Sequence, residues 1–69
     1  MTTYDNDNDI TIHLTNLPGN VRAFSFPSDR GYVVVLNQSM TRKAMRLSYR
    51  HELNHIEQGD HHDTHYTEY

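Results

Sequence analysis

Three residues near the carboxyl end of the chain have the types and spacing of a metal site. The segment YRHELNHIEQGD, residues 49–60, contains the pattern H-E-x-x-H as His51, Glu52 and His55. On a helix, residues four apart lie on one face, so the two imidazoles can point at one ion. Two imidazoles with one further nitrogen or oxygen ligand suit Zn²⁺, and a catalytic site leaves the fourth position to water. The pattern therefore predicts zinc binding by His51 and His55.

Glu52 is the residue of this pattern that could move a proton. With 3.6 residues per helical turn, it lies about 100° from His51 and about 60° from His55. Its carboxylate can therefore reach a water on the metal without binding the metal itself. Zinc lowers the pKa of such a water to about 7, and a nearby glutamate can take its proton as attack on a carbonyl begins. The sequence thus makes Glu52 the candidate general base of a zinc-dependent hydrolase of peptide bonds.

The third metal ligand has three candidates after the predicted helix. His61 lies six residues beyond His55, the offset used in metzincin sites. Glu68 would take the place of the downstream glutamate of gluzincin-type sites if residues 63–69 folded back as a turn of helix. Asp60 comes directly after the predicted helix end. We rank Glu68 and His61 level and Asp60 behind them, since spacing alone does not separate the first two.

The alternative for this motif is an exposed helix face whose histidines are incidental. Six histidines in 69 residues raise the rate at which a short motif arises by chance. The histidines of the tail, His61, His62 and His65, suit a solvated His-rich segment as well as a set of ordered ligands. The elements that would position His51 and His55 therefore decide between the two interpretations.

A single helix over residues 40–58 is predicted to carry the motif. That stretch contains no Pro and no Gly, and Ser39 or Thr41 can cap its amino end. Gly59 stands where a left-handed residue commonly ends a helix. One face carries apolar residues at helical spacing, and we expect it to pack on a sheet and so to fix the direction of the imidazoles. These residues are Met45, Tyr49, Leu53 and Ile56.

Three short strands are predicted before the helix, over residues 10–14, 21–26 and 32–37. The turn signals Pro18-Gly19 and PSDRG, residues 27–31, separate them. YVVVLN is the most apolar run of the chain, which predicts the central and best-buried strand. The expected fold is therefore α+β, a small three-stranded antiparallel sheet followed by one long helix.

The alternation of side chains also assigns them to faces of this sheet. The apolar residues of the first strand should face the core and His13 should face outward. In the second strand, alternate residues form two sets that face opposite sides of the sheet. The core-facing residues of the first strand are Ile10, Ile12 and Leu14, and the two sets of the second are Val21, Ala23 and Ser25 against Arg22, Phe24 and Phe26.

The chain divides into three segments. Residues 1–9 are acidic and polar and are predicted to be disordered, residues 10–60 form a minimal zincin-like domain, and residues 61–69 form a His-rich polar tail. A chain of 69 residues hides only about 60% of its unfolded surface, so its core is thin. The chain has no cysteine and so no disulfide. Additional stabilisation could come from a metal held by His and carboxylate groups, or from a partner subunit.

Charge and composition narrow the classes of partner and compartment. A net charge of -3 argues against nucleic acid as the main partner, although five of the six Lys and Arg residues lie between Arg30 and Arg50. The row formed by Arg42, Arg46 and Arg50 is expected to be a solvated helix face. The first residues have neither a basic start nor an apolar run, so we expect no secretory signal and no membrane partner. The absence of cysteine suits a reducing cytoplasm.

A family resemblance covers roughly residues 17–60. The elements LP, VRAF, YVVVLN, YRHELNHI and GD together resemble the short zinc-peptidase-like proteins of the ImmA/IrrE family, which are common in bacterial mobile elements and prophages. In that family a small antiparallel sheet precedes the H-E-x-x-H helix, and proteolysis is often directed at a repressor. The resemblance implies zinc on His51 and His55, Glu52 as general base, and a peptide or protein substrate. The third ligand of the family usually comes from a following helix, which a second copy in a homodimer could supply.

Two other functions remain open from the sequence. The first is a binding or regulatory protein that keeps the metal for stability alone, since ion binding can contribute much of the folding free energy of a small chain. The second is a metal-dependent ribonuclease, because His51, His55 and His61 also resemble the ligand offsets of YbeY-type endoribonucleases. The acidic charge and the presence of Glu52 argue against the ribonuclease.

Overall fold

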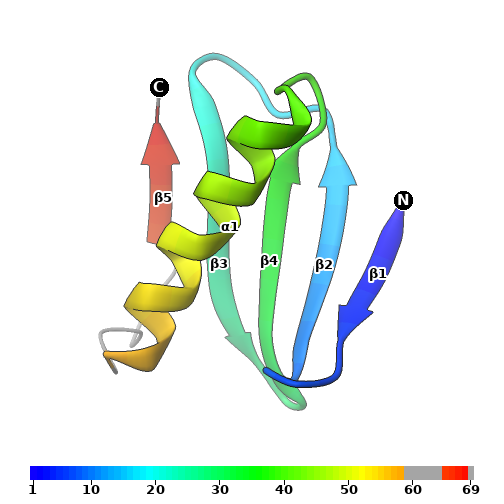
Figure 1. The fold of residues 1–69 in the computed structure, drawn as a ribbon, viewed down its shortest axis with the longest axis vertical. Helices are drawn as coiled ribbons and strands as arrows, with labels where there is room; N and C mark the ends of the chain where they lie inside the picture. The colour runs from blue at the N-terminus through cyan, green and yellow to red at the C-terminus, as the bar shows by residue number, and fades with distance from the viewer. Residues whose placement is uncertain (59–64, 69) are drawn as a thin grey trace.

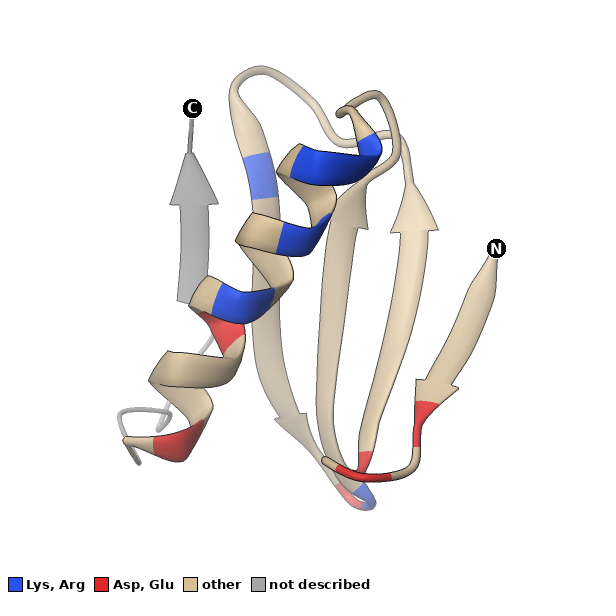
Figure 2. Cartoon of the chain, viewed as in Figure 1, with Lys and Arg blue, Asp and Glu red and all other residues tan. Residues whose placement is uncertain are grey.

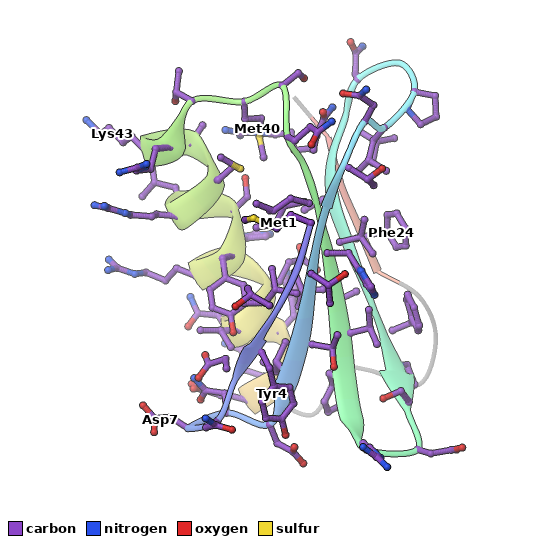
Figure 3. All side chains as sticks on the ribbon, turned by 90° about the vertical axis from the view of Figure 1, so that its right-hand side faces the viewer. Met1, Tyr4, Asp7, Phe24, Met40 and Lys43 are labelled. Atoms are coloured by element: carbon purple, nitrogen blue, oxygen red, sulfur yellow. The ribbon has the colours of Figure 1, made fainter. Side chains whose placement is uncertain are left out.

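The protein is a five-stranded mixed sheet with one helix packed on one face (Figures 1 and 3). The computed structural model describes residues 1–58 and the backbone of residues 65–68. The strand order is β1-β2-β4-β3-β5, with β2 and β4 parallel and the other neighbours antiparallel. The elements are β1 Thr2–Asp5, β2 Ile10–Thr15, β3 Val21–Ser28, β4 Gly31–Asn37, α1 Arg42–Glu57 and β5 His65–Glu68.

The predicted three-stranded antiparallel sheet is therefore wrong in both strand number and strand direction. The three predicted strands exist as β2, β3 and β4, but β4 lies between β2 and β3 and runs parallel to β2. The physical reason lies in β4 itself, because the most apolar strand is buried best with a neighbour on each edge. Val34 is 0% exposed and Leu36 is 4% exposed at this central position. The prediction of β4 as the central strand is confirmed.

A tight hairpin joins β3 to β4. Ser28 pairs with Gly31, so only Asp29 and Arg30 lie between the paired residues. Gly31 has a φ of +108°, and a Cβ built on it would lie 2.4 Å from the carbonyl oxygen of Asp9. Only glycine fits this close approach of two backbone segments. The predicted turn over residues 27–31 is shorter in the structure, because β3 continues through Pro27 to Ser28.

The buried amide of Asn37 holds the connection from β2 to β3 across the end of β4. Its Nδ2 donates to the carbonyl oxygens of Val21 at 3.0 Å and Leu17 at 3.5 Å. Its Oδ1 accepts from the Ser39 backbone N–H at 3.1 Å and from the Ser39 hydroxyl at 2.8 Å. Asn37 is 3% exposed, so these bonds satisfy a polar group that water does not reach. One side chain thus fixes both the crossing connection and the start of the segment leading to α1.

The helix packs on the sheet through the face predicted from the sequence. The core consists of buried apolar residues from β2, β3 and β4, against which four partly buried helix residues pack, and this part of the prediction is confirmed. Figure 3 shows α1 on one side of the sheet and no described element on the other. The core residues are Ile10, Ala23, Val34 and Leu36, and the helix residues are Met45, Tyr49, Leu53 and Ile56.

The ends of α1 agree closely with its sequence signals. Thr41 is the N-cap, and its hydroxyl oxygen accepts from the Ala44 backbone N–H at 3.1 Å. The helix ends at Glu57, followed by Gln58 in a right-handed conformation. The predicted capping role of Gly59 lies outside the described residues. None of the helices among the described residues is long and apolar enough to cross a membrane.

The amino-terminal segment, for which disorder was expected, contains the edge strand β1. Tyr4 pairs with Thr11, and the strand runs antiparallel to β2. Asp5 then accepts hydrogen bonds from Asn8, whose side-chain amide lies 2.8 Å from its Oδ2, and from the Tyr49 hydroxyl at 2.7 Å. The segment is ordered because its polar residues bond to the strand and to the helix, which an argument from apolar content alone does not register.

Candidate functional site

The two histidines of the motif point at each other on the second half of α1. The Nε2 atoms of His51 and His55 lie 3.1 Å apart, with ring centroids separated by 4.7 Å and planes inclined by 76°. His51 is exposed and His55 is partly buried. Since both residues lie on one continuous helix, their relative position is set by the backbone and by the packing of Leu53 and Ile56 beneath them. The two ring nitrogens are therefore close together, as their spacing of one helical turn predicts.

The separation of the two nitrogens fits a zinc ion. Two nitrogens bound to one tetrahedral zinc at about 2.0–2.1 Å lie about 3.3 Å from each other. The observed 3.1 Å is close to that value. The distance also suits a hydrogen bond in which one imidazole donates to the other. The donor pair therefore fits the metal, and it has a stable arrangement in the absence of metal as well.

Glu52 lies between the helix and the sheet rather than on the outer surface of the helix. Its side chain is 0% exposed, and its Oε1 accepts a hydrogen bond from the Ser25 hydroxyl at 2.7 Å. Ser25, also 0% exposed, comes from β3, where it replaces an apolar residue at a position facing the helix. A short hydrogen bond in such a dry place orients the carboxylate firmly. The role of Glu52 as a general base stays a prediction.

Ser25 is a site residue that the motif did not include. The alternation of residues 21–26 placed it on the side of Ala23, and the structure confirms that both are buried on the helix side of the sheet. The sequence signal for this site was the pair of small core-facing residues, Ala23 and Ser25, on a strand predicted to pack against the helix that carries Glu52. Small side chains on β3 leave the room that Glu52 occupies.

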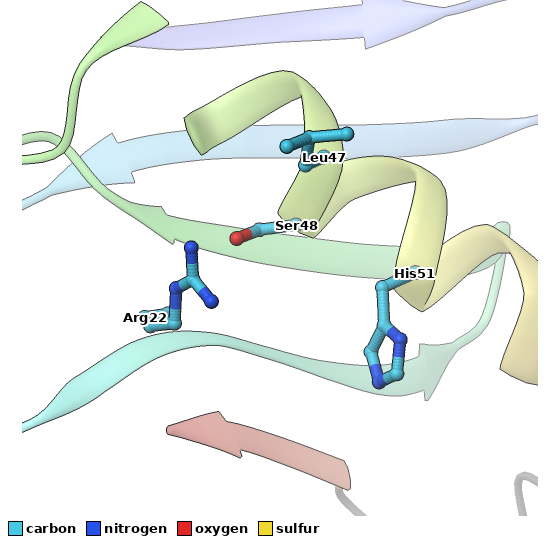
Figure 4. Close-up of a pocket in the computed structure, with 4 residues that line it drawn as sticks. All are labelled: Arg22, Leu47, Ser48 and His51. Carbon is cyan, nitrogen blue, oxygen red and sulfur yellow. The ribbon is translucent and has the colours of Figure 1, made fainter. Parts of the chain in front are cut away.

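A cavity of about 240 Å³ adjoins His51 and contains Arg22, a second residue that the motif did not include. Figure 4 shows Arg22 extending from β3 toward α1, with the Ser48 hydroxyl and the His51 ring on the other side of the cavity. The alternation of β3 placed Arg22 on the side opposite Ala23. A register shift between Val21 and Ala23 breaks that alternation. The irregular strand thus brings a guanidinium group beside the candidate metal pair, where it could bind a carbonyl or a carboxylate.

The side chains of the three candidates for the third ligand lie outside the described part of the chain. His61 and Asp60 lie outside the described residues. Glu68 lies in β5, where its backbone pairs with Val21, and its side chain is outside the description. Among the described side chains, no group of three His, Asp or Glu residues could hold a metal. The ranking of Glu68, His61 and Asp60 stays a prediction.

The arginine row lies on α1, and Figure 2 shows basic residues at several positions along this helix. Arg42, Arg46 and Arg50 are all exposed, which agrees with a solvated helix face.

Comparisons of the chain with protein-family models, with curated proteins and with solved structures find no match. The resemblance to ImmA/IrrE proteins therefore stays a prediction, and the geometry of the site has to be interpreted without relatives.

Proposed function

We propose that the protein binds a zinc ion through His51 and His55. The observation that supports this proposal is the separation of 3.1 Å between the two Nε2 atoms. It is close to the separation of about 3.3 Å expected across a tetrahedral zinc. A third ligand would come from the segment after α1, with Glu68, His61 and Asp60 as the candidates.

The reaction that such a site would support is hydrolysis of a peptide bond. Bound zinc would polarise a substrate carbonyl and lower the pKa of a water in its open position. Around the His pair, the chain offers Glu52, held by Ser25, to take a proton, and Arg22 to hold the carbonyl or carboxylate of a peptide. The substrate would be a peptide or a protein, of which a repressor is one example, in a reducing compartment such as the cytoplasm.

A second use of the metal is supported by the burial of Glu52. A general base has to reach water, and this carboxylate is 0% exposed and already accepts a bond from Ser25. That arrangement favours a binding or regulatory protein in which zinc stabilises the fold without catalysis. At a free zinc concentration of 100 times the dissociation constant, metal binding would add about 2.7 kcal/mol to the free energy of unfolding.

Metal binding is tested first, by measuring the zinc content of the purified chain and by calorimetric titration of the metal-free protein. We expect one zinc per chain, lost in the double variant His51→Ala and His55→Ala. The matched control is His13→Ala, because His13 lies in β2 and its Nδ1 bonds to the Thr2 hydroxyl, away from the pair. Equal zinc binding by the control and the double variant would contradict the proposed site.

The two uses of the metal are then separated with Glu52→Gln, which keeps the shape and the bond from Ser25. Removing a general base lowers a hydrolysis rate by about 100-fold or more. We expect such a loss with unchanged zinc content if the site is catalytic. A wild-type protein that binds zinc but cleaves no member of a mixed peptide library would support the non-catalytic use.

The third ligand can be identified in the same preparation with Co²⁺ in place of zinc. Glu68→Gln, His61→Ala and Asp60→Asn are compared by the visible absorption of the cobalt-loaded protein. The variant that changes the intensity and position of the absorption bands identifies the ligand, because these bands report the coordination geometry.

A further inference from the structure

A second cavity lies beside the first half of α1, between the helix and strands β1, β2 and β4. Its volume is about 360 Å³, at the low end of the range of about 300–1,000 Å³ for small-molecule sites. Side chains that end in methyl or thioether groups form most of its wall, so its surface is largely apolar. The apolar lining residues that matter here are Ile12, Leu14, Leu36 and Met45.

Three cationic groups belong to residues that border this apolar groove. Among the described residues that line it, Arg42 and Arg46 have charged side chains, and both are exposed. Met1 adds its amino-terminal ammonium group, which donates to the Leu14 carbonyl oxygen at 3.1 Å. Both arginines belong to the first half of α1, and Figure 2 shows the basic residues of this helix apart from the acidic residues of the β1–β2 connection. The stems of the two arginines can cover an apolar chain while their guanidinium groups meet an anion at its end. A neutral hydrocarbon would use the wall alone, and a simple anion would use the rim alone.

An acidic group lies next to the groove near Tyr49. Tyr49 lines the groove, and its hydroxyl donates to Oδ2 of Asp5 at 2.7 Å. The carboxylate of Asp5 repels an anion near Tyr49, whereas the arginines attract one. The charges along the groove therefore give a bound anion with an apolar chain a single favoured direction.

We propose that this groove binds a free medium-chain carboxylate. The chain of the ligand would lie on the apolar wall, and its carboxylate would meet Arg42 and Arg46. The small volume favours such a ligand over a folded partner, and the positive rim favours an acid over an alcohol or an amine. This site is separate from the His pair and needs no metal.

Titration of metal-free protein with octanoate, followed by methyl NMR, tests the proposal. We expect saturable shifts at the methyl groups of Ile12, Leu14 and Met45. Decanoate should bind about 15-fold more tightly than octanoate, because two further methylenes leave water. Octanamide, which has the same chain without the charge, should bind more weakly than octanoate. The double variant Arg42→Gln and Arg46→Gln should strongly reduce the preference for octanoate over octanamide while octanamide still binds.

A second test blocks the groove with a large side chain and compares this variant with a matched control. Thr3→Phe introduces a ring at an exposed residue that lines the groove, and it should abolish binding of octanoate. Thr2→Phe places the same ring at the neighbouring exposed residue of β1, which does not line the groove, and binding should persist. Equal affinity for octanoate and octanamide, or no dependence on chain length, would overturn the proposal. A dimer in sedimentation that Thr3→Phe dissociates would overturn it as well, since a second copy would then occupy the groove.

Discussion

Two hydrogen bonds of the same length connect α1 to the sheet, in opposite directions and in different surroundings. In the Ser25–Glu52 link, the acid lies on the helix and the hydroxyl on β3, at 2.7 Å. In the Tyr49–Asp5 link, the hydroxyl lies on the helix and the acid on β1, also at 2.7 Å. Glu52 and Ser25 are both 0% exposed, whereas Asp5 and Tyr49 are partly exposed.

The comparison shows that distance alone does not rank such bonds. When an exposed hydrogen bond is broken, water can bond to the freed groups, so the loss of stability is small. When a buried group loses its partner, no water replaces that partner, and the loss is larger. The buried carboxylate also costs free energy to place under the helix, and a small domain has little to spare. A partly exposed hydrogen bond such as Tyr49–Asp5 would be enough to connect the helix to the sheet. Glu52 is therefore the better candidate for a group retained for function.

The largest effect is expected for Glu52→Ala. The change leaves a cavity beneath the helix and strands the Ser25 hydroxyl, which together cost about 3 kcal/mol in the free energy of unfolding. Urea unfolding monitored by circular dichroism gives the value. Asp5→Ala is the matched control, and it should cost clearly less. Equal losses for the two variants would show that burial does not separate the two links.

Ser25→Ala is expected to have the next largest effect. Removing the donor to a buried carboxylate costs about 1.5 kcal/mol, and alanine fits a position next to Ala23 without strain. The coupling to Glu52 follows from a double-mutant cycle with Glu52→Leu, where Ser25→Ala should cost almost nothing. Ser28→Ala, at an exposed hydroxyl of the same strand, serves as the control. A coupling energy near zero would contradict an energetic role for this bond.

Tyr49→Phe should have a smaller effect than Ser25→Ala. The ring stays packed against the core, and the variant loses only the hydroxyl that donates to Asp5. Burial and the bond to Asp5 hold the pKa of the Tyr49 hydroxyl well above its ordinary value of 10.0. The stability from this neutral phenol is present below pH 10 and is lost as pH rises through the raised pKa. Urea unfolding of the variant and wild type at neutral and alkaline pH checks both expectations.

The smallest expected effect is the acid dependence of the exposed link. Hydrogen bonds from Asn8 and then Tyr49 hold the pKa of the Asp5 carboxyl below its ordinary value of 3.8. A lowered folded pKa means that the charged form stabilises the fold above that value, and the contribution disappears as pH falls through the folded pKa. The difference in stability between wild type and Asp5→Asn should therefore shrink below pH 3.8. A difference independent of pH would show that the charge of Asp5 has no part in the link.

The sequence was sufficient for the elements whose signals are local. The helix was predicted from its apolar spacing and cap, and Thr41 and the four core-facing helix residues lie as expected. The proximity of the His51 and His55 rings follows from their spacing of one helical turn. These features depend on neighbours within a few residues, which any single sequence contains.

The features that escaped prediction depend on distant residues. The parallel pairing of β2 with β4 follows from which strand is best buried in the centre, and from Asn37 holding the crossing connection. Arg22 reaches the helix side because a register irregularity in β3 breaks simple alternation. The burial of Glu52 depends on Ser25, 27 positions earlier in the chain. Periodicity within one segment contains no information on these partners.

The strand order also has a consequence for how the chain folds. The β3–β4 hairpin closes over two residues and can form early, whereas the pairing of β2 with β4 requires a longer loop to close first. Asn37 can make its bonds to the crossing connection only after that closure. The parallel pair is thus expected to belong to the late, rate-limiting part of folding, and substitutions at Asn37 should chiefly accelerate unfolding.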